Sequence, residues 1–371
     1  GPDVDGQHDT QAREAYLDRM WAFVKRLGSA HNSLKVHVLF RRLMHDRAKG
    51  VYDKGRFMTY IKLPRRVGYL PSAFTRTDEY RRYAANLSAD YRRYTQLPIV
   101  SNDEPIVRDY LMHFFLKEDT YQPYMTYIRD TYLKEVFAET KIVNGIGDME
   151  KWYSMLSPAK YQALKERVDL DFAATNKTTF RAGEPVSLDL YVKNVKTLIV
   201  KVYEINTFNY YRERLRPVGT DVNLDGLVAN EEKVHKFEEV ALRRVRRSFD
   251  FPALRKRGVY VVELIGNGKS SRALVRKGRL GYLERTSTAG HVFTVLDESN
   301  RKVPDATIWL AGHKYEPDKD GTVVIPFTNR PGRQARRPAR QTGDEELLEM
   351  VETSQRYFQR AIDAIGRGLP P

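Results

Sequence analysis

The sequence predicts an α+β protein, with a helical region first and antiparallel β-sandwich modules after it. Apolar residues recur at helical spacing from about residue 10 to residue 167. Near residue 169 the spacing changes to short alternating or β-branched runs, separated by clusters of Gly, Pro, Asn and Asp. Evenly spaced short strands of this kind indicate sandwiches rather than a parallel sheet with crossover helices.

The change of spacing divides the chain into five predicted regions. A helical domain covers 1–168, with antiparallel helices and short connections. A β-sandwich with an inserted acidic loop covers 169–285, and a partial second β module covers 286–328. The Arg-, Pro- and Gln-rich segment 329–343 is a predicted basic linker, and 344–371 is a predicted amphipathic helix that must dock on another surface.

Four helices in the first region are predicted from apolar stripes. Gly28 ends the first helix, Asn32 is the predicted N-cap of the second, and Asn102 with Pro105 begins the third. The stripes are Leu17, Met20, Trp21, Val24 and Leu27; Val36, Leu39, Phe40 and Leu43; Ile106, Tyr110, Leu111 and Phe114; and Met125, Ile128, Tyr132, Val136 and Phe137.

Six strands are predicted in the second part of the chain. They cover 186–192, 197–203, 259–265, 291–296, 307–310 and 322–325. Asp297 to Asn300 is a predicted hairpin turn, and Gly321 suits a turn that needs a positive φ. Gly266 to Ser271 superficially resembles a phosphate-binding loop, but Glu263 replaces the first glycine of that pattern, so we expect a hairpin here.

Composition excludes several kinds of site. The chain has no Cys, which rules out disulfides, thiolate metal sites and cysteine nucleophiles. It lacks an apolar run of about 20 residues, so no membrane span is predicted. A formal net charge of +15 predicts attraction to acidic proteins, nucleic acid or another anionic polymer. The opening Gly1-Pro2 is typical of a cleaved expression tag, which indicates a segment of a larger protein.

Two stretches resemble modules of the alpha-2-macroglobulin family. They are 175–188, with Arg181, Gly183 and Glu184 before an alternating apolar run, and 291–326, with its successive Asp- and Gly-containing turns. The resemblance implies a scaffold built of such modules in a large relative of the bacterial type. It also implies a location outside the cytoplasm, in the periplasm, on the cell surface or secreted. The thioester chemistry of that family does not transfer, because it requires the Cys that this chain lacks.

A twelve-residue pattern beginning at Asp221 matches an EF-hand calcium loop. Its oxygen ligands would be the side chains of Asp221, Asn223 and Asp225, the Leu227 carbonyl and the closing Glu232 carboxylate. Pro217 and Gly219 leave no regular helix before the loop. The alternative is an insertion between strands in which Asp and Asn form local turns.

Arginines and tyrosines alternate in two copies of one short pattern, 79–83 and 90–94. An offset of eleven residues on one helix would place the tyrosines on one face and Arg81, Arg82, Arg92 and Arg93 on another. Such a surface could bind phosphates and stack bases. The alternative is a helix whose tyrosines face the core and whose arginines face solvent.

The densest basic run is Arg243, Arg244, Arg246 and Arg247. Val245 and Phe249 alternate with these arginines, which predicts a strand with its charges directed outward. The run is either a docking surface for an acidic partner or a sheet edge protected by charge.

These observations predict a non-enzymatic structural and interaction segment. No catalytic residues are assigned, and calcium is the one expected cofactor. The expected partners are acidic proteins or other modules of the same large protein. The alternative function is binding of nucleic acid or another anionic polymer by the basic helical region.

Overall fold

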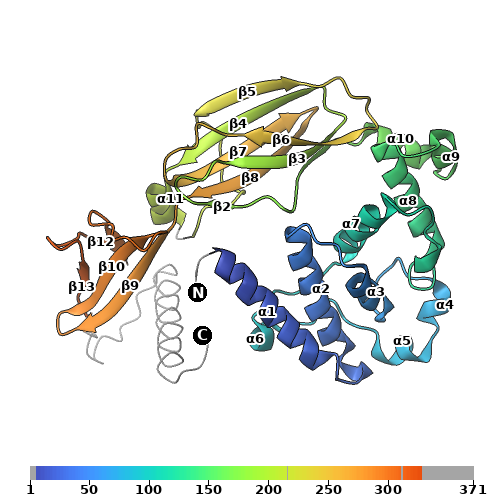
Figure 1. The fold of residues 1–371 in the computed structure, drawn as a ribbon, viewed down its shortest axis with the longest axis horizontal. Coiled ribbons are helices and arrows are strands. Elements are labelled where there is room, and N and C mark those ends of the chain that lie inside the picture. The colour runs from blue at the N-terminus through green and yellow to red at the C-terminus, as the bar shows by residue number, and fades with distance from the viewer. Residues whose placement is uncertain (1–5, 215, 311, 328–371) are drawn as a thin grey trace, which may run out of the picture. The chain divides into compact units, whose positions relative to one another are not determined.

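The computed structural model describes residues 6–214, 216–310 and 312–327 (Figure 1). The predicted linker at 329–343 and the predicted helix at 344–371 lie outside the described residues. The chain divides into two compact units, one from Gly6 to Arg279 and one that begins at Leu280. Helices followed by sheets whose strand pairs are mostly antiparallel confirm the predicted α+β class.

The first part of the larger unit is helical. Its elements are α1 (Gly6–Val24), η1 (Ser29–His31), α2 (Asn32–Ala48), α3 (Lys54–Lys62), α4 (Ser72–Thr75), α5 (Asp78–Tyr83), α6 (Arg92–Thr95), α7 (Glu104–Phe115), η2 (Gln122–Tyr124), α8 (Asp130–Asn144), α9 (Met149–Ser154) and α10 (Pro158–Glu166). The stripes predicted from periodicity supply much of the core. Leu39, Leu43, Tyr110, Leu111 and Val136 are all buried in one cluster.

Three details of the predicted helices are wrong. The first helix, α1, ends at Val24 rather than at Gly28, which precedes η1. Asn32 is the first residue of α2 rather than its N-cap, and its Nδ2 donates a hydrogen bond to the Tyr83 carbonyl 3.2 Å away. Met125 follows the short 3-10 helix η2 and is exposed, so it does not extend the apolar stripe of α8. In contrast, Asn102 does precede α7, as predicted, and its side-chain oxygen accepts a hydrogen bond from the backbone N–H of Glu104, the first residue of the helix.

Strands begin at Asp169, three residues after the end of α10. The strands of the larger unit are β1 (Asp169–Phe172), β2 (Thr179–Phe180), β3 (Ser187–Lys193), β4 (Thr197–Ile205), β5 (Glu231–Lys236), β6 (Arg244–Asp250), β7 (Gly258–Gly266) and β8 (Lys269–Lys277), with helix α11 (Thr207–Arg214) between β4 and β5. They form a five-stranded sheet in the order β2-β8-β7-β4-β5 and a three-stranded sheet in the order β1-β3-β6.

The two sheets pack as a sandwich because their strands alternate buried and partly exposed residues. Leu188, Leu190 and Val192 of β3 join Val200 of β4 and Val262 of β7 in one apolar core. All the predicted strands of this module are present. The expected hairpin at Gly266 is also confirmed, since Gly266 pairs with Lys269 and both intervening residues have positive φ.

The smaller unit contains short sheets. Its strands are β9 (Leu280–Ser287), β10 (Gly290–Asp297), β11 (Ile308–Leu310), β12 (His313–Tyr315) and β13 (Val323–Ile325). They pair as β13-β10-β9 and β11-β12. The predicted turns are confirmed: the Asp297 carboxylate accepts hydrogen bonds from the backbone of Ser299 and Arg301, and Gly321 has φ +64°.

Candidate interaction site

A buried ion pair fixes the chain segment that leads into the candidate site. Arg65 and Asp103 are both fully buried, with 3.0 Å between Arg65 Nε and Asp103 Oδ2. The hydroxyl groups of Tyr60 and Tyr69 donate to the same carboxylate. Although burial by itself lowers the pKa of the Arg65 guanidinium, its interactions with Tyr69, Tyr60 and Asp103 raise that pKa above the ordinary value. This network immobilises the backbone at residue 65.

Backbone hydrogen bonds then align this segment with the end of α5. The Ala85 N–H donates to the Pro64 carbonyl, and the Arg66 N–H donates to the Ala85 carbonyl. Because neighbouring side chains of an extended segment point to opposite sides, Arg65 enters the core while Arg66 is exposed. The same pairing brings Ala84 and Arg66 to one surface.

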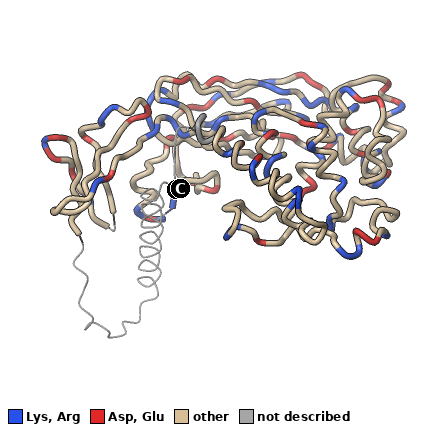
Figure 2. Tube along the Cα trace, turned by 60° about the horizontal axis from the view of Figure 1, so that its bottom comes forward, with Lys and Arg blue, Asp and Glu red and all other residues tan. Residues whose placement is uncertain are grey.

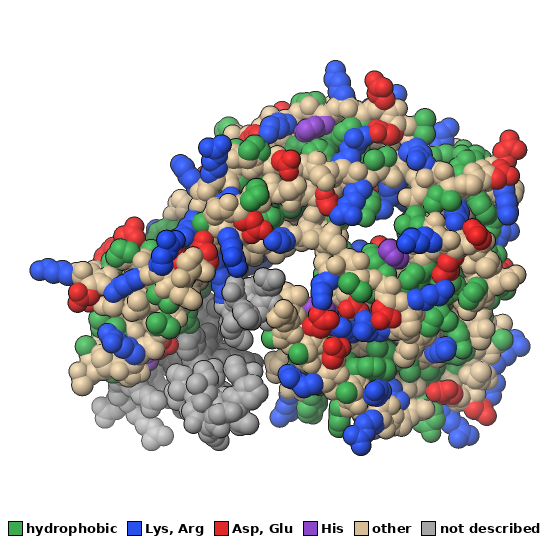
Figure 3. Space-filling model, viewed as in Figure 1, with side chains coloured by type: hydrophobic (Ala, Val, Ile, Leu, Met, Phe, Trp, Pro, Cys, Tyr) green, Lys and Arg blue, Asp and Glu red, His purple; other side chains and the backbone are tan. Residues whose placement is uncertain are grey.

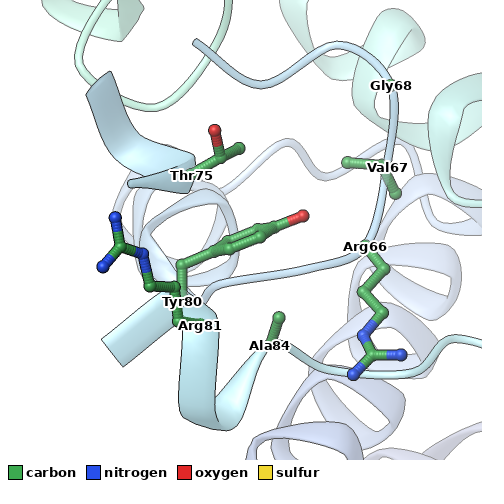
Figure 4. A pocket seen from close by; sticks show the side chains of 7 residues that line it. All are labelled: Arg66, Val67, Gly68, Thr75, Tyr80, Arg81 and Ala84. Atoms are coloured by element: carbon green, nitrogen blue, oxygen red, sulfur yellow. The ribbon is translucent and has the colours of Figure 1, made fainter. Parts of the chain in front are cut away.

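These contacts create an open pocket of about 500 Å³, which we call the α4–α5 pocket. Figure 4 shows the residues that line it: Arg66, Val67, Gly68, Thr75, Tyr80, Arg81 and Ala84. The Tyr80 ring extends between Thr75 and Ala84, and Arg66 and Arg81 lie on different sides of the ring (Figure 4). Tyr80 is held by an edge-on contact with Phe74, with 6.4 Å between ring centroids.

Most arginines around this pocket form no ion pair with an acidic residue of the described structure. Arg66, Arg76 and Arg82 have no acidic partner among the described residues. Arg81 is 3.9 Å from the exposed Asp78 carboxylate, a separation at which a solvated pair contributes little. The pocket therefore combines an apolar and aromatic lining with guanidinium groups available to a partner.

The predicted face of repeated arginines does not exist. The helix ends at Tyr83 because Ala84 and Ala85 become extended and pair with the segment at Pro64. Arg92 and Arg93 belong to the separate short helix α6, where Arg92 forms an ion pair with Asp90. Tyr94 is 77% exposed, so the alternative of a core-facing tyrosine stripe is also wrong.

The four arginines near β6 form mostly internal contacts. Arg244 interacts with Asp169 and Asp171, and its guanidinium lies 4.1 Å from the centroid of the Tyr191 ring. Arg246 pairs with Asp189 and Arg247 pairs with Glu239. Arg243 is exposed and precedes the strand. The predicted outward-facing strand is present at a sheet edge, but three of its charges are already neutralised.

The predicted calcium ligands are not gathered around one point. Glu232 lies in β5 opposite Lys201, with 3.4 Å between their charged atoms. Asp221 forms an ion pair with Arg216, and the Asn223 side chain accepts a hydrogen bond from the Asp225 backbone. Val222 and Leu224 are buried against Tyr203, Val261 and Leu274 on the sandwich. Leu227 is exposed. Calcium binding at this loop stays a prediction.

A second pocket of about 430 Å³ lies between the edge strands β5 and β6. Buried Phe249 and Phe251 line it together with His235 and Phe237. Its arginine, Arg247, contacts both Glu239 and the Phe237 ring. The α4–α5 pocket therefore offers more unpaired positive charge.

Charge elsewhere is distributed rather than concentrated. Figure 2 shows Lys and Arg positions along both sheets and helices with Asp and Glu between them, and the face in Figure 3 has the same mixture. Over the described part of the chain, no cluster of three or more His, Asp or Glu side chains is arranged to hold a metal ion. No described helix has the length and apolar character that a membrane span requires.

Most residues of the α4–α5 pocket belong to no pattern that local sequence would reveal. Arg81 belonged to a recognised basic pattern, but Arg66, Val67 and Gly68 lie in a connection. Only the long-range pairing of Arg65 with Ala85 brings them beside Tyr80.

Two family models match the chain in succession. Residues 1–168 match the model of the Actin-binding protein F N-terminal domain, and residues 198–278 match the model of the first immunoglobulin-like domain of that protein. Actin-binding protein F of Dictyostelium discoideum is 34% identical over 324 residues, which are 85% of this chain and 13% of that protein. The chain thus spans about one eighth of the length of this relative.

The macroglobulin resemblance has weaker support. A crystal structure of Escherichia coli alpha-2-macroglobulin spanning MG0-NIE-MG1 matches 43% of this chain and 57% of that one, at 12% identity and a TM-score of 0.28. A shorter NIE-MG1 structure matches 44% of this chain and 88% of that one, at 12% identity and a TM-score of 0.27. These values are too low to assign the chain to that family.

The expected location outside the cytoplasm is wrong. It came only from the macroglobulin resemblance, whereas the sequence match is to a protein named for binding actin, a cytoskeletal protein. The comparisons place the likeness of this chain in the N-terminal and first immunoglobulin-like domains of Actin-binding protein F.

Proposed function

We propose that this chain is a protein-binding region whose partner is the actin filament, with a structural and interaction role rather than an enzymatic one. The observation that carries this proposal is the 34% identity over 324 residues to Actin-binding protein F. That match extends across the helical domain and into the sandwich, in the order of the two family models. The partner is a proposal because this chain corresponds to 13% of its relative.

The charge of the chain supports association with an acidic surface. A formal net charge of +15 accelerates encounter with such a surface and makes binding sensitive to salt. Arg66, Arg76 and Arg82 have no acidic partner among the described residues, so a partner does not have to displace an internal ion pair.

Co-sedimentation of the full chain with actin filaments tests this function. We expect the chain to pellet with filaments at about 50 mM salt and to bind more weakly at about 200 mM, because screening reduces the attraction between exposed charges. A chain that stays in the supernatant at the lower salt would contradict the proposal. Retention on immobilised DNA without pelleting would instead favour the anionic-polymer function.

A further inference from the structure

We propose that the α4–α5 pocket binds an acidic segment of a protein partner, with an apolar side chain in the pocket and flanking carboxylates on Arg66 and Arg81. The inference rests on the proposed function, because it names the surface by which this chain would bind its partner. It also specifies the chemistry that the surface recognises.

The lining of the pocket favours an apolar side chain. Val67, Ala84 and the ring of Tyr80 supply carbon surface within about 500 Å³, a volume typical of sites for small groups. The ring is already positioned by Phe74, which itself packs edge-on against Tyr127 at 5.7 Å. Binding therefore does not require the aromatic group to be ordered first.

The surrounding charge favours carboxylates beside that side chain. Residues 62–94 include eight Lys and Arg and three Asp and Glu. Arg65 and Arg92 are neutralised by Asp103 and Asp90, whereas Arg66, Arg76 and Arg82 have no acidic partner in the described structure. A guanidinium group binds a carboxylate through two parallel hydrogen bonds, which fixes the orientation of the partner.

The arrangement is less suited to nucleic acid. Binding of a single strand needs successive aromatic rings along a basic groove. The interruption at Ala84 separates Tyr80 from Tyr91 and Tyr94, so one tyrosine ring lines this pocket. An acidic protein segment, in contrast, can place an apolar side chain in the single pocket and its carboxylates on the arginines at the rim.

The test compares two double variants of the full chain in co-sedimentation with actin filaments. R66A/R81A removes both arginines of the pocket. R19A/R93A removes the same charge from exposed positions on α1 and α6, neither of which lines the pocket or has an acidic partner among the described residues. We expect R66A/R81A to weaken the apparent Kd about tenfold or more and R19A/R93A less than about threefold.

A third variant, Ala84→Leu, fills the pocket without changing charge. We expect it to weaken filament binding while the circular dichroism spectrum and melting temperature stay those of the unmodified chain. Equal weakening by the two double variants, or full binding by both R66A/R81A and Ala84→Leu, would overturn the proposed site.

A second probe separates failure of the pocket from failure of the proposed function. If the unmodified chain does not pellet with filaments, actin is not its partner, and a fluorescent peptide of alternating glutamate and leucine then tests the pocket directly. Peptide binding that is lost in R66A/R81A and kept in R19A/R93A supports the site. Peptide binding that is absent, or equal in both variants, overturns the proposed site. Binding of a labelled oligonucleotide that is lost in R66A/R81A and kept in R19A/R93A also overturns it, because the pocket would then bind nucleic acid.

Discussion

The side-chain amine of Lys193 in β3 donates hydrogen bonds to the carbonyl oxygens of Leu164 and Arg167, at 2.5 and 2.7 Å, where α10 ends. Lys193 is 1% exposed. Burial, opposed by the attraction of Asp169, lowers the pKa of this amine to about 8. The carbonyl groups at the end of a helix carry partial negative charge, so they favour a cation at this position.

Further polar contacts surround this amine. The Arg167 guanidinium forms ion pairs with Glu139 of α8 and with Asp169 of β1, both at 2.8 Å. Arg244 of β6 also pairs with Asp169. The helical domain and the first sandwich are thus joined through hydrogen-bonded charges rather than through a continuous apolar core.

The first prediction concerns this junction. Lys193→Met keeps much of the buried volume but leaves two carbonyl groups without their donor, which costs about 1–3 kcal/mol of unfolding free energy. Lys196→Met is the control, since Lys196 is exposed nearby in the chain. Urea unfolding followed by circular dichroism measures both variants. Equal stability of the two would show that the Lys193 contacts do not strengthen the junction.

A second prediction concerns the segment below the α4–α5 pocket. Asp103→Ala leaves the guanidinium of Arg65 buried without its carboxylate, and the loss of one partner of a buried pair costs about 3–5 kcal/mol. The control Asp90→Ala unpairs the exposed Arg92, and we expect its melting temperature to stay unchanged. Thermal unfolding compares the two. Similar effects would mean that the Arg65 network does not stabilise the helical domain.

A third prediction follows from His37 in α2. The side chain is 2% exposed, and the ring contacts Tyr91 edge-on. Neither ring nitrogen has a hydrogen-bond partner among the residues that the structure describes. Burial, reinforced by the charge of Arg41 and opposed by that of Asp90, lowers the pKa of His37 to about 4. Protonation is therefore easier in the unfolded chain, where the pKa is about 6.5.

The difference between the folded and unfolded pKa values of His37 determines whether stability rises or falls with pH. The stability associated with neutral His37 is fully present above about pH 6.5 and falls as pH decreases toward 4, by up to about 1.4 kcal/mol per pH unit. We expect His37→Leu to reduce this slope in urea unfolding at pH 7, 6 and 5. His45 and His113 also have lowered pKa values, so part of the slope should remain. An unchanged slope would exclude His37 as a source.

The sequence alone predicts those elements whose structure depends on residues close together in the chain. Strands β3, β4 and β7 follow from their alternating apolar residues, and the hairpin at Gly266 follows from its turn residues. The site depends instead on distant pairs. The helix through Tyr80 ends because Ala85 pairs with Pro64. Asn32 donates a hydrogen bond to the Tyr83 carbonyl instead of capping α2. The spacing of apolar residues does not indicate which distant segments of the chain will pair.

Calcium binding at the Asp221 loop provides a fourth prediction. The ion would have to break the Asp221–Arg216 pair and draw Glu232 away from Lys201, so we expect weak affinity. At millimolar calcium the melting temperature should rise, chelator should reverse the rise, and Asp221→Ala should abolish it. Melting curves that coincide with calcium and with chelator would rule the site out.

The fifth prediction uses two glycines of the smaller unit that both have positive φ. Gly290 has φ +136°, and a Cβ there would lie 2.7 Å from the Pro326 Cα and against the Ile325 backbone at the end of β13. Gly312 has φ +84°, and no described atom outside its chain neighbours lies within 4 Å of the Cβ that a substitution would add there. Alanine at Gly312 should therefore cost about 1 kcal/mol of backbone strain. Alanine at Gly290 adds a clash with backbone atoms, which a rotamer change cannot relieve.

Hydrogen exchange of the β10 and β13 amides measures this difference in the full chain. We expect Gly290→Ala to reduce their protection strongly, because β10 must move away from β13 where His291 pairs with Ile325. Gly312→Ala should leave these amides nearly unchanged. If the two variants exchange alike, close contact between Gly290 and the end of β13 does not hold this sheet together, and positive φ alone accounts for the glycine.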